Sequence, residues 1–235
     1  MSTEKKRYPD AEEQKGNFRR SAATGAVVGV SAPTRTEPGT ADLPVPQRST
    51  PEEALRQLLA GNERFAANQL TSVQQDLEVL KEHTADRQEP FAAVLACADS
   101  RVPVELVFDQ TIGHIFVTRI AGNMVTPEII ASLEYGVAVL GVKVLLVLGH
   151  TSCGAVRAAM NSDAVPGQIS VLYKHLRPAV EKSGGDLDKA IEFNAEQQAE
   201  LLRTTSAVIG DAVKGGKLVL RAGVYELASG KVSLR

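Results

Sequence analysis

The sequence predicts an α/β fold with a mostly parallel central sheet flanked by helices and an N-terminal helical arm. Three short runs rich in apolar residues, at 91–96, 114–120 and 143–148, have the length of buried strands. Segments with helical periodicity separate these runs. Strands that are apolar on both faces and alternate with helices are typical of a parallel sheet covered on both sides.

A helix over residues 51–68 forms the predicted arm. Thr50 can cap it, Pro51 suits the first helical position, and Glu53 completes a capping box. Leucines then recur at helical spacing. The other predicted helices cover 72–83, 103–109, 127–140, 154–160, 168–182 and 186–213, and the chain ends with a strand at 217–225 and a short hairpin return at 231–234.

The chain divides into a flexible N-terminal tail, residues 1–48, and a folded domain, residues 49–235. The tail is rich in charged residues at first and in proline, threonine and glycine later, so it cannot bury enough apolar surface to offset the cost of ordering it. Arg19 and Arg20 precede a weakly apolar segment, 21–30, which leaves a twin-arginine-like export signal as the alternative to a plain tail.

Composition excludes several classes of partner. With 26 basic and 28 acidic residues the net charge is −2, which gives no electrostatic basis for binding nucleic acid. No run of residues approaches the length of a membrane span. The two cysteines are too few for a disulfide framework, so they indicate metal-binding or reactive thiols in a reduced compartment, which favours the cytoplasm.

Each cysteine lies in a polar motif directly after an apolar strand. Cys97 follows 91–96, and His150 and Cys153 follow 143–148. The carboxyl ends of parallel strands meet at one edge of a sheet, so the two motifs are expected to form one site. Taken singly, the residues would be two buried thiols and a loop histidine. Together, two thiolates and an imidazole suit Zn2+ and leave a fourth position open for water.

Asp99 and Arg101, beside the first cysteine, would supply the chemistry of such a site. Arg101 would keep Asp99 ionised, and Asp99 would accept a hydrogen bond from zinc-bound water or hydroxide and orient it. Zinc lowers the pKa of a bound water molecule to about 7, which produces hydroxide near neutral pH. Asp99 could also move onto the zinc and close the site in an inactive state.

These motifs resemble those of the β-class carbonic anhydrases. The match consists of Cys-x-Asp-Ser-Arg followed about fifty residues later by Gly-His-x-x-Cys-Gly, and the resemblance covers residues 50–225. It implies that Cys97, His150 and Cys153 are the zinc ligands and that Asp99 and Arg101 form the catalytic dyad. The implied reaction is the reversible hydration of CO2 to bicarbonate and a proton by zinc-bound hydroxide.

Further positions are similar to the plant-type branch of the family. The resemblance implies that a glutamine donates to a substrate oxygen and that aromatic walls line the pocket, partly across a dimer interface. It also implies a homodimer or a dimer of dimers, in which the arm packs on a neighbouring subunit. The substrate-pocket residues assigned in this way are Gln88, Phe116, Ala121, Tyr135 and Gly154.

Two other functions fit the same residues. The first is a hydrolase that uses the zinc site on a CO2-like substrate such as carbon disulfide. The second is a non-catalytic zinc or redox-sensing protein of the same fold, which would bind the metal without turnover.

Overall fold

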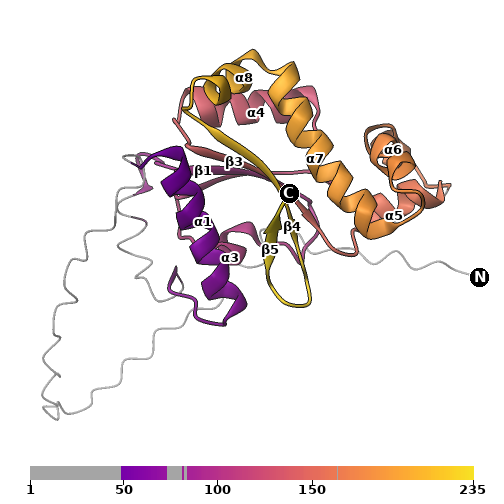
Figure 1. The fold of residues 1–235 in the computed structure, drawn as a ribbon, viewed down its shortest axis with the longest axis horizontal. Coiled ribbons are helices and arrows are strands. Elements are labelled where there is room, and N and C mark those ends of the chain that lie inside the picture. The colour runs from indigo at the N-terminus through magenta and orange to yellow at the C-terminus, as the bar shows by residue number, and fades with distance from the viewer. Residues whose placement is uncertain (1–48, 73–80, 82–83, 163) are drawn as a thin grey trace, which may run out of the picture. The chain divides into compact units, whose positions relative to one another are not determined.

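The computed structural model describes residues 49–72, 81, 84–162 and 164–235 (Figure 1). The tail predicted over residues 1–48 lies outside the described residues, as does almost all of the helix predicted over 72–83. In the part of the chain that is described, no helix is both long and apolar enough to cross a membrane.

A five-stranded sheet forms the centre of the described chain, with the order β2-β1-β3-β4-β5. The first four strands are parallel and β5 runs antiparallel to β4. The predicted fold class is therefore confirmed. Among the described strands, only β5, the predicted hairpin return, is antiparallel to its neighbour. The strands are β1 (Ala92–Ala96), β2 (Ile115–Arg119), β3 (Val144–His150), β4 (Val219–Tyr225) and β5 (Val232–Leu234).

The register of the parallel strands places the two cysteine motifs at the same edge. Ala96, the last residue of β1, is paired with Leu148 of β3 and with Arg119 of β2. The residues that follow these three positions therefore emerge together at the carboxyl edge of the sheet. This is the edge at which open α/β sheets bind ligands.

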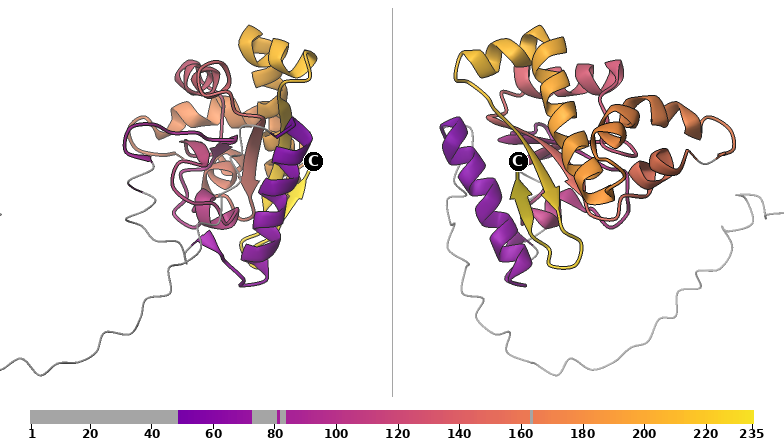
Figure 2. Two further views of the ribbon diagram at one scale, coloured as in Figure 1. Left: turned by 90° about the vertical axis from the view of Figure 1, so that its left-hand side faces the viewer. Right: turned by 45° about the vertical axis from the view of Figure 1, so that its right-hand side comes forward.

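Helices cover both faces of the sheet (Figures 1 and 2). On one face, Val94 and Leu146 pack with α1 (Pro51–Ala66) and α3 (Val104–Val107). On the other face, Leu95 and Val147 pack with three further helices. This alternation follows from the pleat, because successive side chains of a strand point to opposite faces. The three helices are α4 (Pro127–Ala138), α7 (Leu187–Thr205) and α8 (Ala207–Lys214).

The predicted arm is helix α1, which ends two residues earlier than predicted. Its capping box is present, with the Thr50 and Glu53 side chains each accepting from the other's backbone N–H. Within the described chain, α1 packs against its own sheet through the fully buried Ala54 and Leu58. Asn62, also buried, donates to the carbonyls of Val107 and Gly230 and accepts from Val232 N.

Two predicted helices differ from the structure. The helix predicted over 186–213 is divided into α7 and α8 at Ser206, which is extended (φ −101°, ψ 114°) and caps α8 by accepting from Ile209 N. Serine competes for backbone hydrogen bonds and favours such caps. The helix predicted over 168–182 begins as a 3-10 turn, η4 (Ile169–Leu172), and continues as α6 (Tyr173–Lys182).

Candidate metal centre

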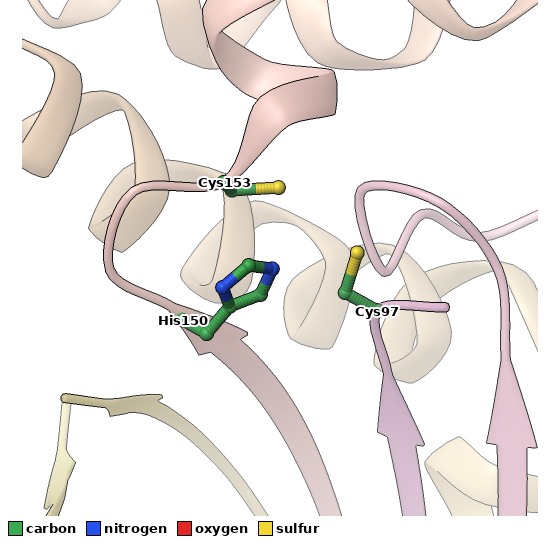
Figure 3. A group of neighbouring side chains, drawn as sticks. All are labelled: Cys97, His150 and Cys153. Carbon is green, nitrogen blue, oxygen red and sulfur yellow. The ribbon is translucent and has the colours of Figure 1, made fainter. Parts of the chain in front are cut away.

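Cys97, His150 and Cys153 converge at the carboxyl edge of the sheet, with their side chains directed toward a common centre (Figure 3). One ligand atom from each, two sulfurs and a ring nitrogen, all lie within 4.8 Å of one another. All three residues are buried, His150 completely. Cys97 follows β1, and Cys153 is the N-cap of α5 (Gly154–Asn161).

His150 is the last residue of β3 rather than part of the following loop. The strand was predicted to end at residue 148, and it continues for two residues because β4 pairs with it as far as Tyr225, the partner of His150. Thr151 N then donates to the Tyr225 carbonyl. The imidazole is thus held by a regular ladder on its own backbone, which fixes the direction from which it enters the site.

The ring of His150 is oriented as a metal ligand requires. Its Nδ1 lies 3.0 Å from the Thr151 carbonyl, which only accepts, so Nδ1 carries the proton and Nε2 keeps its lone pair. Nε2 is buried and has no hydrogen-bond partner. An acceptor left unpaired in this way costs about 1–3 kcal/mol, and ligation of a metal ion would remove that cost. This orphaned nitrogen fits a metal at the centre of the group.

The two sulfurs interact with each other as well as with backbone N–H groups. Hydrogen bonding between them lowers the pKa of Cys97 and raises the pKa of Cys153, and burial adds to that second increase. Gly122 N donates to Cys97 Sγ over 3.3 Å. A divalent, thiophilic cation between the sulfurs would favour ionisation of both.

Asp99 and Arg101 form a two-pronged ion pair beside the three residues. Arg101 Nε donates to Asp99 Oδ1 over 2.9 Å and Arg101 Nη2 donates to Oδ2 over 2.7 Å. These hydrogen bonds hold the pKa of Asp99 far below its usual range. Asp99 Oδ2 lies 3.8 Å from His150 Nε2. The carboxylate therefore sits at the border of the site, ionised and directed by the guanidinium.

Arg119 also shapes the site, although it was not among the residues predicted from the sequence. It ends β2, and its Nε donates to the Cys97 carbonyl over 2.9 Å, while its Nη2 donates to the Asp99 carbonyl. The exposed guanidinium of Arg119 thereby holds the backbone of Cys97 and of Asp99 in place. A charged residue at the end of an apolar strand was the available signal.

The structure divides the predicted pocket residues into two groups. Ala121 and Gly154 lie beside the three converging residues, Ala121 next to Gly122 and Gly154 directly after Cys153. Phe116 is paired with Ala93, near the start of β1, so about four residues of strand, roughly 13 Å, separate it from Cys97.

Tyr135 packs against Phe116 with tilted rings, whose centroids are 6.2 Å apart, and the tyrosine is 47% exposed. Gln88 is exposed and precedes β1, at the opposite edge of the sheet from Cys97. Within one chain, these aromatic and amide side chains are not brought to the candidate metal centre. Their match to the plant-type branch stays a prediction that depends on a second subunit.

Comparison with known proteins agrees with this geometry. The family model described as carbonic anhydrase matches residues 92–232. "Carbonic anhydrase 2" of Mycobacterium tuberculosis is 35% identical to this chain over 195 residues, covering 80% of this chain and 94% of that protein.

Solved structures show the same fold. The β-carbonic anhydrase CafA of Aspergillus fumigatus is 26% identical and covers 77% of this chain and 90% of its own, with a TM-score of 0.63. A β-carbonic anhydrase of Sordaria macrospora, described as tetrameric, is 22% identical and covers 77% of this chain and 96% of its own, also with a TM-score of 0.63. The chain belongs to the β-class carbonic anhydrase family.

Proposed function

We propose that this protein catalyses the reversible reaction of CO2 with water to give bicarbonate and a proton, using zinc held by Cys97, His150 and Cys153. The observation that carries the proposal is the buried group of two sulfurs and one imidazole nitrogen within 4.8 Å, bordered by the Asp99–Arg101 ion pair. A site of this kind combines three protein ligands with a neighbouring polar group that can orient a small reactant.

The donor set favours zinc. Thiolate and imidazole ligands select borderline or soft cations, whereas Mg2+ and Ca2+ prefer oxygen ligands. When bound, zinc supplies a Lewis acid that lowers the pKa of water to about 7 and so provides a nucleophile near neutral pH. The buried unpaired Nε2 of His150 supports this assignment.

Asp99 acts as an orienting acceptor. Arg101 occupies both of its carboxylate oxygens from one side, which fixes the plane of the carboxylate and leaves its remaining lone pairs for the attacking water. The oriented water adds to the carbon of CO2, bicarbonate leaves, and the proton passes to solvent. Ligation of the metal by Asp99 in a closed state would require it to give up hydrogen bonds with Arg101.

Stopped-flow CO2 hydration with zinc-loaded protein tests the proposal. We expect a rate well above the uncatalysed reaction between pH 7 and 9, and loss of that rate after the metal is removed with a chelator. Readdition of zinc to the stripped protein should restore it. A protein that contains one zinc per chain and hydrates no CO2 above background would contradict the proposed reaction.

We also propose that the chain assembles as a homodimer or a dimer of dimers through the β2 edge. β2 is a terminal strand of the sheet, and apolar side chains are exposed beside it: Ile112 is 47% exposed, Tyr135 47% and Val139 64%. An edge strand next to exposed apolar residues is a typical association surface. Association there would also let one subunit's Phe116 and Tyr135 approach the other's metal centre.

Replacing Val139 with aspartate is expected to reduce the molar mass measured by light scattering, because a charge would be buried in the interface. Val171→Asp is the matched control, since Val171 is 45% exposed on η4, which contacts α5 and α6. Equal masses for both variants and the parent protein would place the association surface elsewhere.

A further inference from the structure

A buried pair of amide side chains on α7 contacts the loop that approaches Cys97. Asn194 and Gln198 lie four residues apart, one helical turn, and are 1% and 0% exposed. They fall on the apolar face of the helix, between residues that pack on the sheet. Polar side chains at such positions are costly unless they are fully hydrogen-bonded, so their partners indicate what they hold.

Besides longer contacts of 3.5 Å to the His175 carbonyl and to Asn123 Oδ1, their partners are each other and the backbone of the β2–α4 loop, residues 120–126. Asn194 Nδ2 donates to the Gly122 carbonyl over 2.9 Å, and Gln198 Oε1 accepts from Val125 N over 2.8 Å. Gln198 Nε2 donates to Asn194 Oδ1 over 3.1 Å. This last bond orients Asn194: because its oxygen is engaged by Gln198, Asn194 must direct its N–H group at the loop.

The loop needs such support because its backbone is in the left-handed region. Gly122 has a φ of +78° and Asn123 a φ of +40°. The positive φ of Gly122 favours glycine, and a Cβ there would also lie 3.0 Å from the Leu176 side chain, closer than an ordinary contact. In this conformation the Gly122 N–H points at Cys97 Sγ while its carbonyl points at α7.

We propose that Asn194 and Gln198 are positioning residues for the metal centre, which hold the β2–α4 loop so that Gly122 N–H donates to Cys97 Sγ. The inference rests on the proposed metal site and concerns what holds one of its ligands. A hydrogen bond to a ligating thiolate moderates the charge that the sulfur gives to the metal. The amide pair therefore acts on the metal through the loop, without contacting it.

The test compares Asn194→Leu with Asn62→Leu. Asn62 is a matched control, because it is also buried, also satisfies backbone groups, and lies on α1 against Val107 and the β4–β5 hairpin. Both variants should lose folding stability. Asn194→Leu alone is expected to release zinc to a chelator about tenfold faster, the usual size of an effect from a group behind a metal ligand.

A second measurement reports on the sulfur itself. In cobalt-substituted protein, the thiolate-to-cobalt charge-transfer band should move to lower energy in Asn194→Leu, because a thiolate without the Gly122 hydrogen bond gives up charge more readily. Asn62→Leu should leave the band where it is in the parent protein. Gln198→Met, a milder change of similar shape, should shift the band in the same direction by a smaller amount. It is the test variant to use if Asn194→Leu does not fold.

Equal zinc release and unchanged bands in the Asn194, Gln198 and Asn62 variants, compared at the same folded fraction, would overturn the inference and leave the amide pair a purely structural feature. These readouts do not depend on catalysis. A parent protein that binds zinc but hydrates no CO2 would contradict the proposed function and leave the positioning role open to the same measurement.

Discussion

Cys153→Ser is expected to lose zinc and, with it, the CO2 hydration activity. Cys153 Sγ is one of three ligand atoms in the buried group, and a serine hydroxyl stays protonated near neutral pH and is a poor ligand for zinc. Structural zinc sites with four ligands bind with about 10–16 kcal/mol, so one ligand accounts for roughly 3–4 kcal/mol, or two to three powers of ten in affinity. Metal content after dialysis and stopped-flow rates measure both effects.

Ala159→Ser is the matched control for this variant. Ala159 lies on α5 in the same apolar cluster as Cys153, so the control adds a hydroxyl to that cluster without touching the ligand set. It should retain one zinc per chain and the parent rate. If Cys153→Ser binds zinc as tightly as the control, Cys153 is not a ligand and the proposed site is incorrect.

Asp99→Asn is expected to keep zinc and to lower kcat/KM by about 100-fold or more, the usual cost of removing one preorganised polar group from an active site. The asparagine has the shape of the aspartate but is neutral, and one of the two atoms that face Arg101 becomes a donor, so the two-pronged pairing is broken. The amide can then present the wrong group to the attacking water. Zinc content and rates are measured on the same sample.

Asp211→Asn controls for the loss of a carboxylate in general. Asp211 is exposed on α8 and its only ion pair in the described chain is with Lys214, 3.8 Å away. Its loss should leave the rate unchanged, because an exposed pair contributes little. Full activity in Asp99→Asn, with zinc present, would assign the orientation of the nucleophile to another group.

The convergence of the candidate metal ligands followed from a rule about parallel sheets. Cys97 and His150 are far apart in the sequence, yet each stands at the carboxyl end of an apolar strand, and β1 and β3 are neighbours in register.

The lengths of strands and helices were less predictable. Strand β3 reaches His150 because β4 pairs with it as far as Tyr225, and local periodicity carries no information about such a pairing. The division of the last long helix at Ser206 was missed for a similar reason. Ser206 Oγ caps α8 and donates to Glu134 on α4, which stabilises the break from outside the segment.

By itself, the sequence determined the α/β class, the capped helix from Pro51, and the choice of Cys97, His150 and Cys153 as candidate metal ligands, because these depend on residue types at short spacings. Tertiary structure alone decided which groups support that chemistry. Arg119 braces the Cys97 and Asp99 carbonyls from a neighbouring strand, and Asn194 reaches the Gly122 carbonyl from 72 residues away. Hydrogen bonds of this kind depend on how helices and strands pack. The local sequence around the donor or the acceptor has no periodicity or motif that predicts the partner residue.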